Sequence, residues 1–216
     1  GIILEDDCMP DPTFFRYCTE MLLLYRDSPR VMMVSGLDCT VSPGLEGSHY
    51  FHKYQLIWGW ATWRRAWACM DIELDGWKVG PKIRFLRRHC TRLDELLYWL
   101  EIFNAYSTEG NRGPTWDYQW LYSMWTRGGL CASPHGNLIR NLGFGAAATH
   151  TFNRCDMHDM PTKPMRFPIV REEIVVNLSK QDEIRCRFYM SGRRGVSFIA
   201  SWIKREVFRW CGIGPH

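Results

Sequence analysis

The chain has 216 residues, of which 46% are hydrophobic and 23% charged, and its formal net charge is +4. This composition is typical of a globular protein with enough apolar side chains for a core. The mildly basic balance, with an isoelectric point of about 8.6, is too weak to indicate a nucleic-acid partner. The nine cysteines form no C-x-x-C pair, which favours reduced thiols and a cytoplasmic location. No apolar run is long enough to cross a bilayer.

The first 34 residues predict a strand, an acidic turn, a helix and a second strand. A short apolar run at 2–4 indicates the strand, and apolar residues at helical spacing within 13–26 indicate the helix. Asp11 is the expected N-cap and Pro12 the first-turn proline. A second strand is expected at 30–34. This order is typical of a parallel α/β sheet, so we expect an α/β fold with a mostly parallel sheet flanked by helices.

The middle of the chain predicts a loop followed by helices. The loop is expected at 37–57, and a helix is expected to begin within "ATWRRAW". Further helices are expected at 81–92, 93–106 and 116–126. They are followed by a short strand at 130–133 and by irregular structure at 135–151. The composition changes at residue 153, where "MPTKPMRFP" indicates a linker or an extended strap. We therefore expect one domain at 1–152 and a strap with a tail at 153–216.

Residues 196–210 form an amphipathic, basic pattern in the C-terminal tail. One interpretation is a helix that docks on the core. The other is a helix that rests on an anionic membrane surface, which would make the protein peripheral at the inner face of the membrane.

Three consecutive acids, Glu5, Asp6 and Asp7, follow the first strand. Ligands of open α/β sheets bind beyond the carboxyl ends of the strands, and neighbouring carboxylates there repel one another. A divalent cation that also contacts phosphate oxygens would relieve the repulsion. We expect Asp7 to be the metal ligand, Asp6 to face ribose or sugar hydroxyls, and Glu5 to support the turn. The alternative is a solvated acidic turn.

"WGWATWRRAW" is the most distinctive stretch of the sequence. Gly59 permits a close backbone approach, and Trp58 and Trp60 flank it. The stretch could form a flat apolar wall for a sugar ring, or it could be a tryptophan-rich corner of the core.

Two further residues are candidates for chemistry. Asp117, in "TWDYQW", could be the N-cap of the following helix, or a general base that takes the proton from an attacking hydroxyl. His150, in "GFGAAATHT", could complete a metal site or bind a diphosphate from a mobile lid, although a lone histidine is more often structural.

The order of these motifs resembles that of the GT-A nucleotide-sugar glycosyltransferases. "ILEDDCMPDPTFFRYC", "VMMVSG", "WGWATWRRAW", "TWDYQW", "LCASPHGNLIRNLGFG" and "THT" occur in the family's order across about residues 1–151. The chain is most similar to the branch related to the N-acetylglucosaminyltransferases that begin N-glycan branching, and to similar bacterial sugar transferases.

The resemblance implies an inverting transfer that requires Mn²⁺ or Mg²⁺. It assigns the metal to Asp7 and the catalytic base to Asp117. The sugar donor would be bound by Glu5, Asp6, Gly36, Gly59, Trp60, Phe144 and Gly145, with His150 in the loop that closes over the diphosphate. The donor would be a nucleotide-diphosphate sugar, and the acceptor a glycan, lipopolysaccharide or glycolipid.

The sequence departs from the family's pattern in two places. Residues 71–114 are longer and more helical than expected, which leaves the acceptor open. The family's first strands and helices, which hold the nucleotide base, are expected before Ile2, so we expect the chain to begin inside a domain, and alone it could be inactive. Two other functions remain open: a non-catalytic carbohydrate-binding protein, and a nucleotidyltransferase that releases pyrophosphate.

Overall fold

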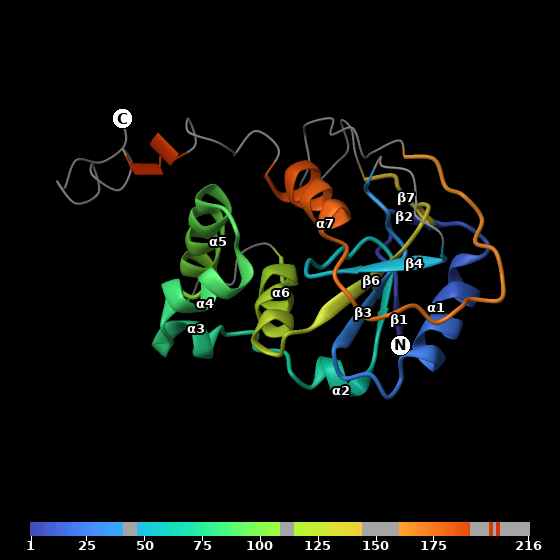
Figure 1. Cartoon of the computed structure of the whole chain (residues 1–216), viewed down its shortest axis with the longest axis horizontal. Helices are drawn as coiled ribbons and strands as arrows, with labels where there is room; N and C mark the ends of the chain where they lie inside the picture. The colour runs from blue at the N-terminus through green and yellow to red at the C-terminus, as the bar shows by residue number, and fades with distance from the viewer. Residues whose placement is uncertain (41–46, 109–114, 144–159, 191–198, 201, 204–216) are drawn as a thin grey trace. The chain divides into compact units, whose positions relative to one another are not determined.

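The computed structural model describes residues 1–40, 47–108, 115–143, 160–190, 199–200 and 202–203 (Figure 1). These residues have a mixed α/β structure and divide into two compact units. The first unit contains 1–70 and 123–185, and the second contains 71–122 and 186–216. The expected boundary at residue 153 stays a prediction, as does the helix at 196–210, which lies largely outside the described residues.

The first unit is built on a five-stranded sheet. The strands in spatial order are β1 (Ile2–Ile3), β5 (Trp60–Thr62), β3 (Val31–Ser35), β6 (Leu130–Pro134) and β4 (His49–His52). Among these strands β3 and β6 pair in parallel, and the other neighbours pair antiparallel. The expected mostly parallel sheet is therefore wrong. The reason is that β5 and β4, within or next to the expected loop, run back along the sheet.

Three strands nevertheless run in one direction. Because β5 is antiparallel to both β1 and β3, these two strands point the same way, and β6 is parallel to β3. The carboxyl ends of β1, β3 and β6 therefore share one edge of the sheet. The acidic turn follows β1 at this edge.

A second, two-stranded sheet follows the acidic turn. β2 (Cys8–Pro10) pairs antiparallel with β7 (Ile139–Asn141), so that Cys8 lies opposite Asn141. β7 occupies part of the segment that was expected to be irregular. The pairing places the acidic turn beside a segment more than 130 residues further along the chain.

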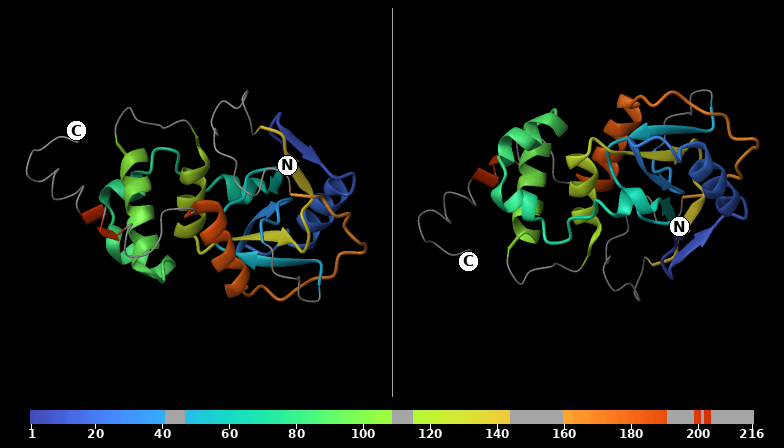
Figure 2. Two further views of the ribbon diagram at one scale, coloured as in Figure 1. Left: turned by 90° about the horizontal axis from the view of Figure 1, so that it is seen from above. Right: turned by 90° about the horizontal axis from the view of Figure 1, so that it is seen from below.

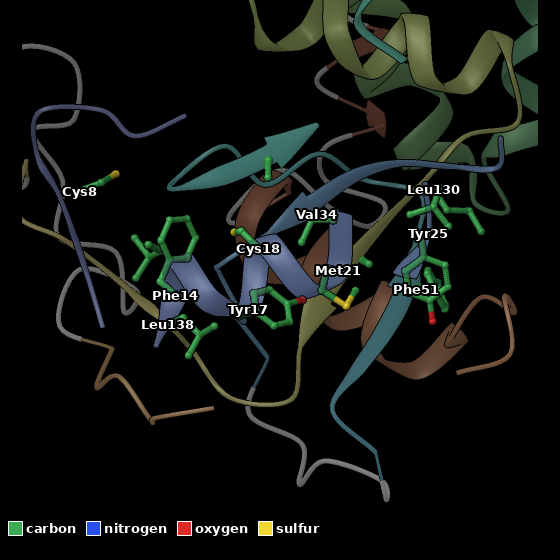
Figure 3. Packing of buried hydrophobic residues seen from close by; sticks show 14 residues of the cluster. Cys8, Phe14, Tyr17, Cys18, Met21, Tyr25, Val34, Phe51, Leu130 and Leu138 are labelled. Carbon is green, nitrogen blue, oxygen red and sulfur yellow. The ribbon is translucent and has the colours of Figure 1, made fainter. Parts of the chain in front are cut away.

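Helix α1 (Phe14–Leu24) covers the five-stranded sheet with its apolar face (Figure 3). Tyr17, Met21 and the following Tyr25 are fully buried, together with Val34 of β3. The expectation that Asp11 is the N-cap is wrong, because the N-cap of α1 is Thr13, two residues later. Asp11 Oδ1 instead accepts hydrogen bonds from the Thr13 amide at 2.9 Å and the Thr13 hydroxyl at 2.6 Å. The side chain therefore orders the turn that leads into the helix.

Residues 160–176 form an extended strap along α1 (Figures 1 and 2). The backbone amide of Met165 donates to the Thr13 hydroxyl at 2.9 Å, and that of Ile169 donates to Glu20 Oε2 at 3.1 Å. Helix α7 (Leu178–Ile184) and a π-helix (Arg185–Tyr189) follow the strap.

Helices dominate the second unit. They are α3 (Asp75–Val79), α4 (Lys82–His89), α5 (Leu93–Tyr106) and the first part of α6 (Asp117–Thr126). Trp77, Trp99 and Phe103 are almost fully buried and form its aromatic core. The expected helices at 81–92, 93–106 and 116–126 are confirmed to within a few residues. The helix predicted at "ATWRRAW" is α2 (Arg64–Trp67), preceded by β5. No helix in the described part of the chain combines the length and apolarity that a membrane span requires.

Candidate functional site

The acidic turn joins β1 to β2 and is closed by a hydrogen bond from the Cys8 amide to the Glu5 carbonyl, at 3.1 Å. Glu5 and Asp7 are half-buried, whereas Asp6 is exposed. One carboxylate oxygen of Glu5, one of Asp7 and the Cys8 sulfur all lie within 4.8 Å of one another. A search of the described residues finds no other group of three potential metal ligands. The structure thus brings together two of the three predicted acids, and adds Cys8.

The chemistry of this cluster suits a hard cation. Burial and the neighbouring Asp7 and Glu5 carboxylates raise the pKa of the Cys8 thiol to about 12. The thiol therefore keeps its proton at neutral pH, and its sulfur lies 3.6 Å from Asp7 Oδ1 as a donor. Two carboxylates are the kind of protein ligands that Mg²⁺ or Mn²⁺ takes, whereas zinc favours thiolate and imidazole.

Asp7 also packs against the end of β7. Its carbonyl accepts a hydrogen bond from the Leu142 amide at 2.7 Å, and the Gly143 amide donates to Asn141 Oδ1, also at 2.7 Å. A Cβ atom at position 143 would overlap the Asp7 carboxylate where it now lies, so a larger residue there would require the carboxylate to move. The sequence did not point to Asn141 or Gly143, because their proximity to Asp7 depends on the pairing of β2 with β7.

The chain continues from Gly143 into residues that the structure does not describe. Phe144, Gly145 and His150 all fall among them. Their assignment to the donor site and to the metal stays a prediction.

Two of the three glycines predicted to bind the sugar donor, Gly36 and Gly59, lie side by side. The Gly36 amide donates to the Gly59 carbonyl at 2.8 Å. A Cβ atom on Gly36 would lie 2.8 Å from Cγ1 of Ile139, and one on Gly59 would lie 2.7 Å from the same atom. Gly59 also has a φ of +62°, which favours glycine. The close approach at both glycines is therefore made by a side chain of this protein.

Trp60 lies in β5 opposite Ile3, and only 1% of its surface is exposed. A tryptophan that stacks on a sugar presents an open ring face, which Trp60 does not. The contacts of Gly59 and Trp60 favour the interpretation of this stretch as a corner of the core. The stretch lies at the carboxyl edge of the sheet, where Trp60 pairs with Ser35 at the end of β3.

Asp117 is the first residue of α6 and is half-buried. The Thr115 hydroxyl donates to its Oδ1. The carboxylate lies near Tyr106, whose pKa is raised to about 12 by burial, by Tyr118 and by Asp117. The helix dipole favours a carboxylate at the start of a helix. The same carboxylate can accept a proton from a ligand, so a structural role at the helix start and a role as general base both remain open for Asp117. It belongs to the second unit, and the acidic turn belongs to the first.

A buried polar network at the carboxyl edge was missed by the sequence analysis. Asp38, just after β3, accepts hydrogen bonds from the Thr40 hydroxyl at 2.6 Å, the Tyr50 hydroxyl at 3.0 Å and the Gly136 amide at 3.0 Å. The Lys180 ammonium donates to Thr40 Oγ1 at 2.5 Å. The position of Asp38 soon after a strand could have identified it as a candidate. No pattern in the sequence around Lys180 could have identified Lys180.

This network supports one wall of a pocket of about 430 Å³. The pocket lies between the start of β4, the turn after β6 and the strap, and is lined in part by Ser48, His135, Lys163 and Arg166. Burial and the charge of Lys180 lower the pKa of His135, so its imidazole is neutral at physiological pH. A polar hollow therefore opens at the same edge of the sheet as the acidic turn.

No protein-family model matches the sequence, and no curated protein is significantly similar to it.

Proposed function

We propose that this protein is a metal-dependent, inverting glycosyltransferase with a GT-A type of fold. It would transfer a sugar from a nucleotide-diphosphate donor to a hydroxyl group of a glycan, lipopolysaccharide or glycolipid. The observation that carries the proposal is the pair of Glu5 and Asp7 carboxylates, held together at the shared carboxyl edge of β1, β3 and β6.

Electrostatics favours a cation at this pair. Two carboxylates within a few ångströms repel each other, and partial burial strengthens the repulsion. The repulsion is relieved when a divalent cation binds both, and a diphosphate fills the remaining positions of such a cation well. When bound, Mn²⁺ or Mg²⁺ would supply positive charge that stabilises the leaving nucleoside diphosphate.

Residues of the chain would bind the cation, orient its ligands and accept the proton. Glu5 and Asp7 would hold the cation, while the protonated Cys8 thiol orients the Asp7 carboxylate by its hydrogen bond. Asp117 would accept the proton of the acceptor hydroxyl as the new glycosidic bond forms. Thr115 donates a hydrogen bond to Asp117 Oδ1 and would help to orient the carboxylate.

The test is to identify the product. The protein is incubated with Mn²⁺, simple sugar acceptors and a panel of UDP-, GDP- and dTDP-sugars, and the released nucleotides are separated by chromatography. We expect release of a nucleoside diphosphate from one donor class. Asp117→Asn should lower its rate by about 10²- to 10⁴-fold, the usual contribution of a general base.

Asp75→Asn is the matched control, because Asp75 also lies in the first turn of a helix of the second unit. It should leave the rate unchanged. Release of pyrophosphate instead would identify a nucleotidyltransferase. Binding of sugars without any nucleotide release, or without need of a metal, would indicate a carbohydrate-binding protein, and either result contradicts the proposal.

A further inference from the structure

The helical unit contains a pocket of its own, of about 270 Å³. It lies between α3, the start of α4 and the Tyr122 side chain of α6. Three cationic and three aromatic side chains line it: Lys82, Arg84, Arg88, Trp77, Phe85 and Tyr122. No acidic residue is among the described residues that line it.

The arginines of this pocket point to an anionic ligand. Arg84 and Arg88 are one helical turn apart on α4, so their side chains project from the same face. Both side chains are exposed, and no hydrogen bond or ion pair connects either guanidinium to another described residue. Like charges at this spacing repel, and an anion between them removes the repulsion.

Two acids that lie close to the pocket residues in the sequence, Asp71 and Asp75, have partners outside α4. The Asp71 carboxylate accepts hydrogen bonds from the backbone amides of Asp75 at 3.0 Å and Gly76 at 3.1 Å. Asp75 pairs with Lys78, at 2.9 Å. Neither carboxylate neutralises Arg84 or Arg88, and the positive charge of the pocket remains available to a ligand.

The aromatic residues of the pocket differ in exposure: Trp77 and Tyr122 are almost fully buried, and Phe85 is half-buried. The Trp77 indole N–H and the Lys82 ammonium both donate to Asn104 Oδ1, at 3.1 and 2.8 Å. Phe85 packs on Tyr122 with ring centroids 5.2 Å apart. The exposed part of Phe85 can contact the C–H groups of a sugar ring, and the adjacent cations can contact acidic groups on it. A bare inorganic anion would leave the aromatic part of the pocket unused.

We infer that this pocket binds an anionic sugar, a hexose that carries a phosphate or a carboxylate, as part of the acceptor glycan. The role as acceptor site rests on the proposed function, whereas the binding itself does not. All residues that line the pocket except Tyr122 lie within 71–114, the segment whose greater length and helical content leave the acceptor open in the family comparison.

The test is direct binding to the whole chain without nucleotide or metal. Glucose 6-phosphate, glucuronate, glucose and inorganic phosphate are titrated at low salt, with calorimetry as the readout. We expect glucose 6-phosphate or glucuronate to bind at least about tenfold more tightly than glucose and inorganic phosphate. Comparing the two acidic sugars identifies whether the preferred group is a phosphate or a carboxylate.

Arg84→Gln and Arg88→Gln should each weaken this binding by about tenfold, as expected for one charge-assisted contact. Arg87→Gln is the matched control: Arg87 is exposed on the same helix but does not line the pocket, and its loss should change binding less than twofold. Circular dichroism of each variant checks that it is folded.

Three results would overturn the inference. They are equal binding of glucose and the acidic sugars, equal binding of inorganic phosphate and glucose 6-phosphate, and equal losses in Arg87→Gln and Arg84→Gln. Asp7→Asn should leave the binding intact. Tight binding of an acidic sugar by a protein that releases no nucleoside diphosphate would support the pocket and overturn its role as an acceptor site.

Discussion

Gly59 and Gly128 have the same backbone conformation, with φ at +62°, but different surroundings. A Cβ atom on Gly59 would overlap the side chain of Ile139, whereas one on Gly128 would meet nothing within 4 Å. Substituting alanine at each of the two glycines therefore separates the free-energy cost of backbone strain from the cost of overpacking. It also tests whether the space beside Gly59 belongs to the core or to a ligand.

We predict that Gly59→Ala lowers the free energy of unfolding by about 2–4 kcal/mol, since it combines backbone strain with overpacking. Gly128→Ala should lower it by only about 1 kcal/mol, from strain alone. Urea unfolding followed by tryptophan fluorescence measures both. Equal losses in the two variants would show that Ile139 does not confine Gly59.

At the residue scale, the acidic residues of the candidate site could be predicted from the sequence, but most of the residues that surround them in the structure could not. Glu5 and Asp7 could be predicted because a run of acids directly after a strand is unusual and has a clear physical meaning. Cys8 and Asn141 could not, because their part in the cluster depends on a turn and on a strand pairing between distant segments. Gly59 was recognised as a place of close approach, but the sequence could not show that Ile139 is what approaches it.

At the scale of elements, the end of α1 is connected to the start of β3 by one side chain of α2. The Arg65 guanidinium donates to the backbone carbonyls of Tyr25, Ser28 and Val31 at 2.9–3.0 Å, and its Nε donates to that of Arg26 at 2.9 Å. Tyr25, Arg26 and Ser28 lie in the turn after the helix, and Val31 begins β3. The guanidinium therefore adds a charged donor to carbonyls on both sides of the connection. Arg65 therefore fixes the geometry of the α1–β3 connection.

We predict that Arg65→Met lowers the free energy of unfolding by about 2 kcal/mol or more, because several carbonyls lose a charged donor. Arg64→Met is its neighbour on the same helix and is exposed, so its effect should stay within about 0.5 kcal/mol. Chemical denaturation of the two variants provides the comparison. A similar, small effect in both would mean that water replaces the guanidinium without loss.

Most of the elements that the sequence predicted have many residues, although the short β1 and α2 were predicted as well. The pattern of α1 and α5 repeats over several turns, and β3 is a continuous apolar run. The strands β4, β5 and β7 have only three or four residues each, too few for a recognisable period. They are strands because partners elsewhere in the chain pair with them.

At the scale of the whole molecule, the α/β class could be predicted but the direction of the strands could not. The opening strand, helix and strand do run as expected, with β1 and β3 in one direction, yet β5 lies between them. Strand order is a property of the tertiary structure, and no local pattern specifies it. The expectation that mattered for function, a shared carboxyl edge beyond β1 and β3, survives this difference.

The measurement that tests the central claim most directly is a calorimetric titration of the protein with Mn²⁺, alone and with UDP, GDP or dTDP. The account predicts binding that one nucleoside diphosphate strengthens. Asp7→Asn should weaken Mn²⁺ binding at least about tenfold, or about 1.4 kcal/mol. Asp6→Asn, which removes the same charge from the exposed position of the same turn, should weaken it far less. An absence of Mn²⁺ binding by the folded protein, or equal losses in the two variants, would contradict the account.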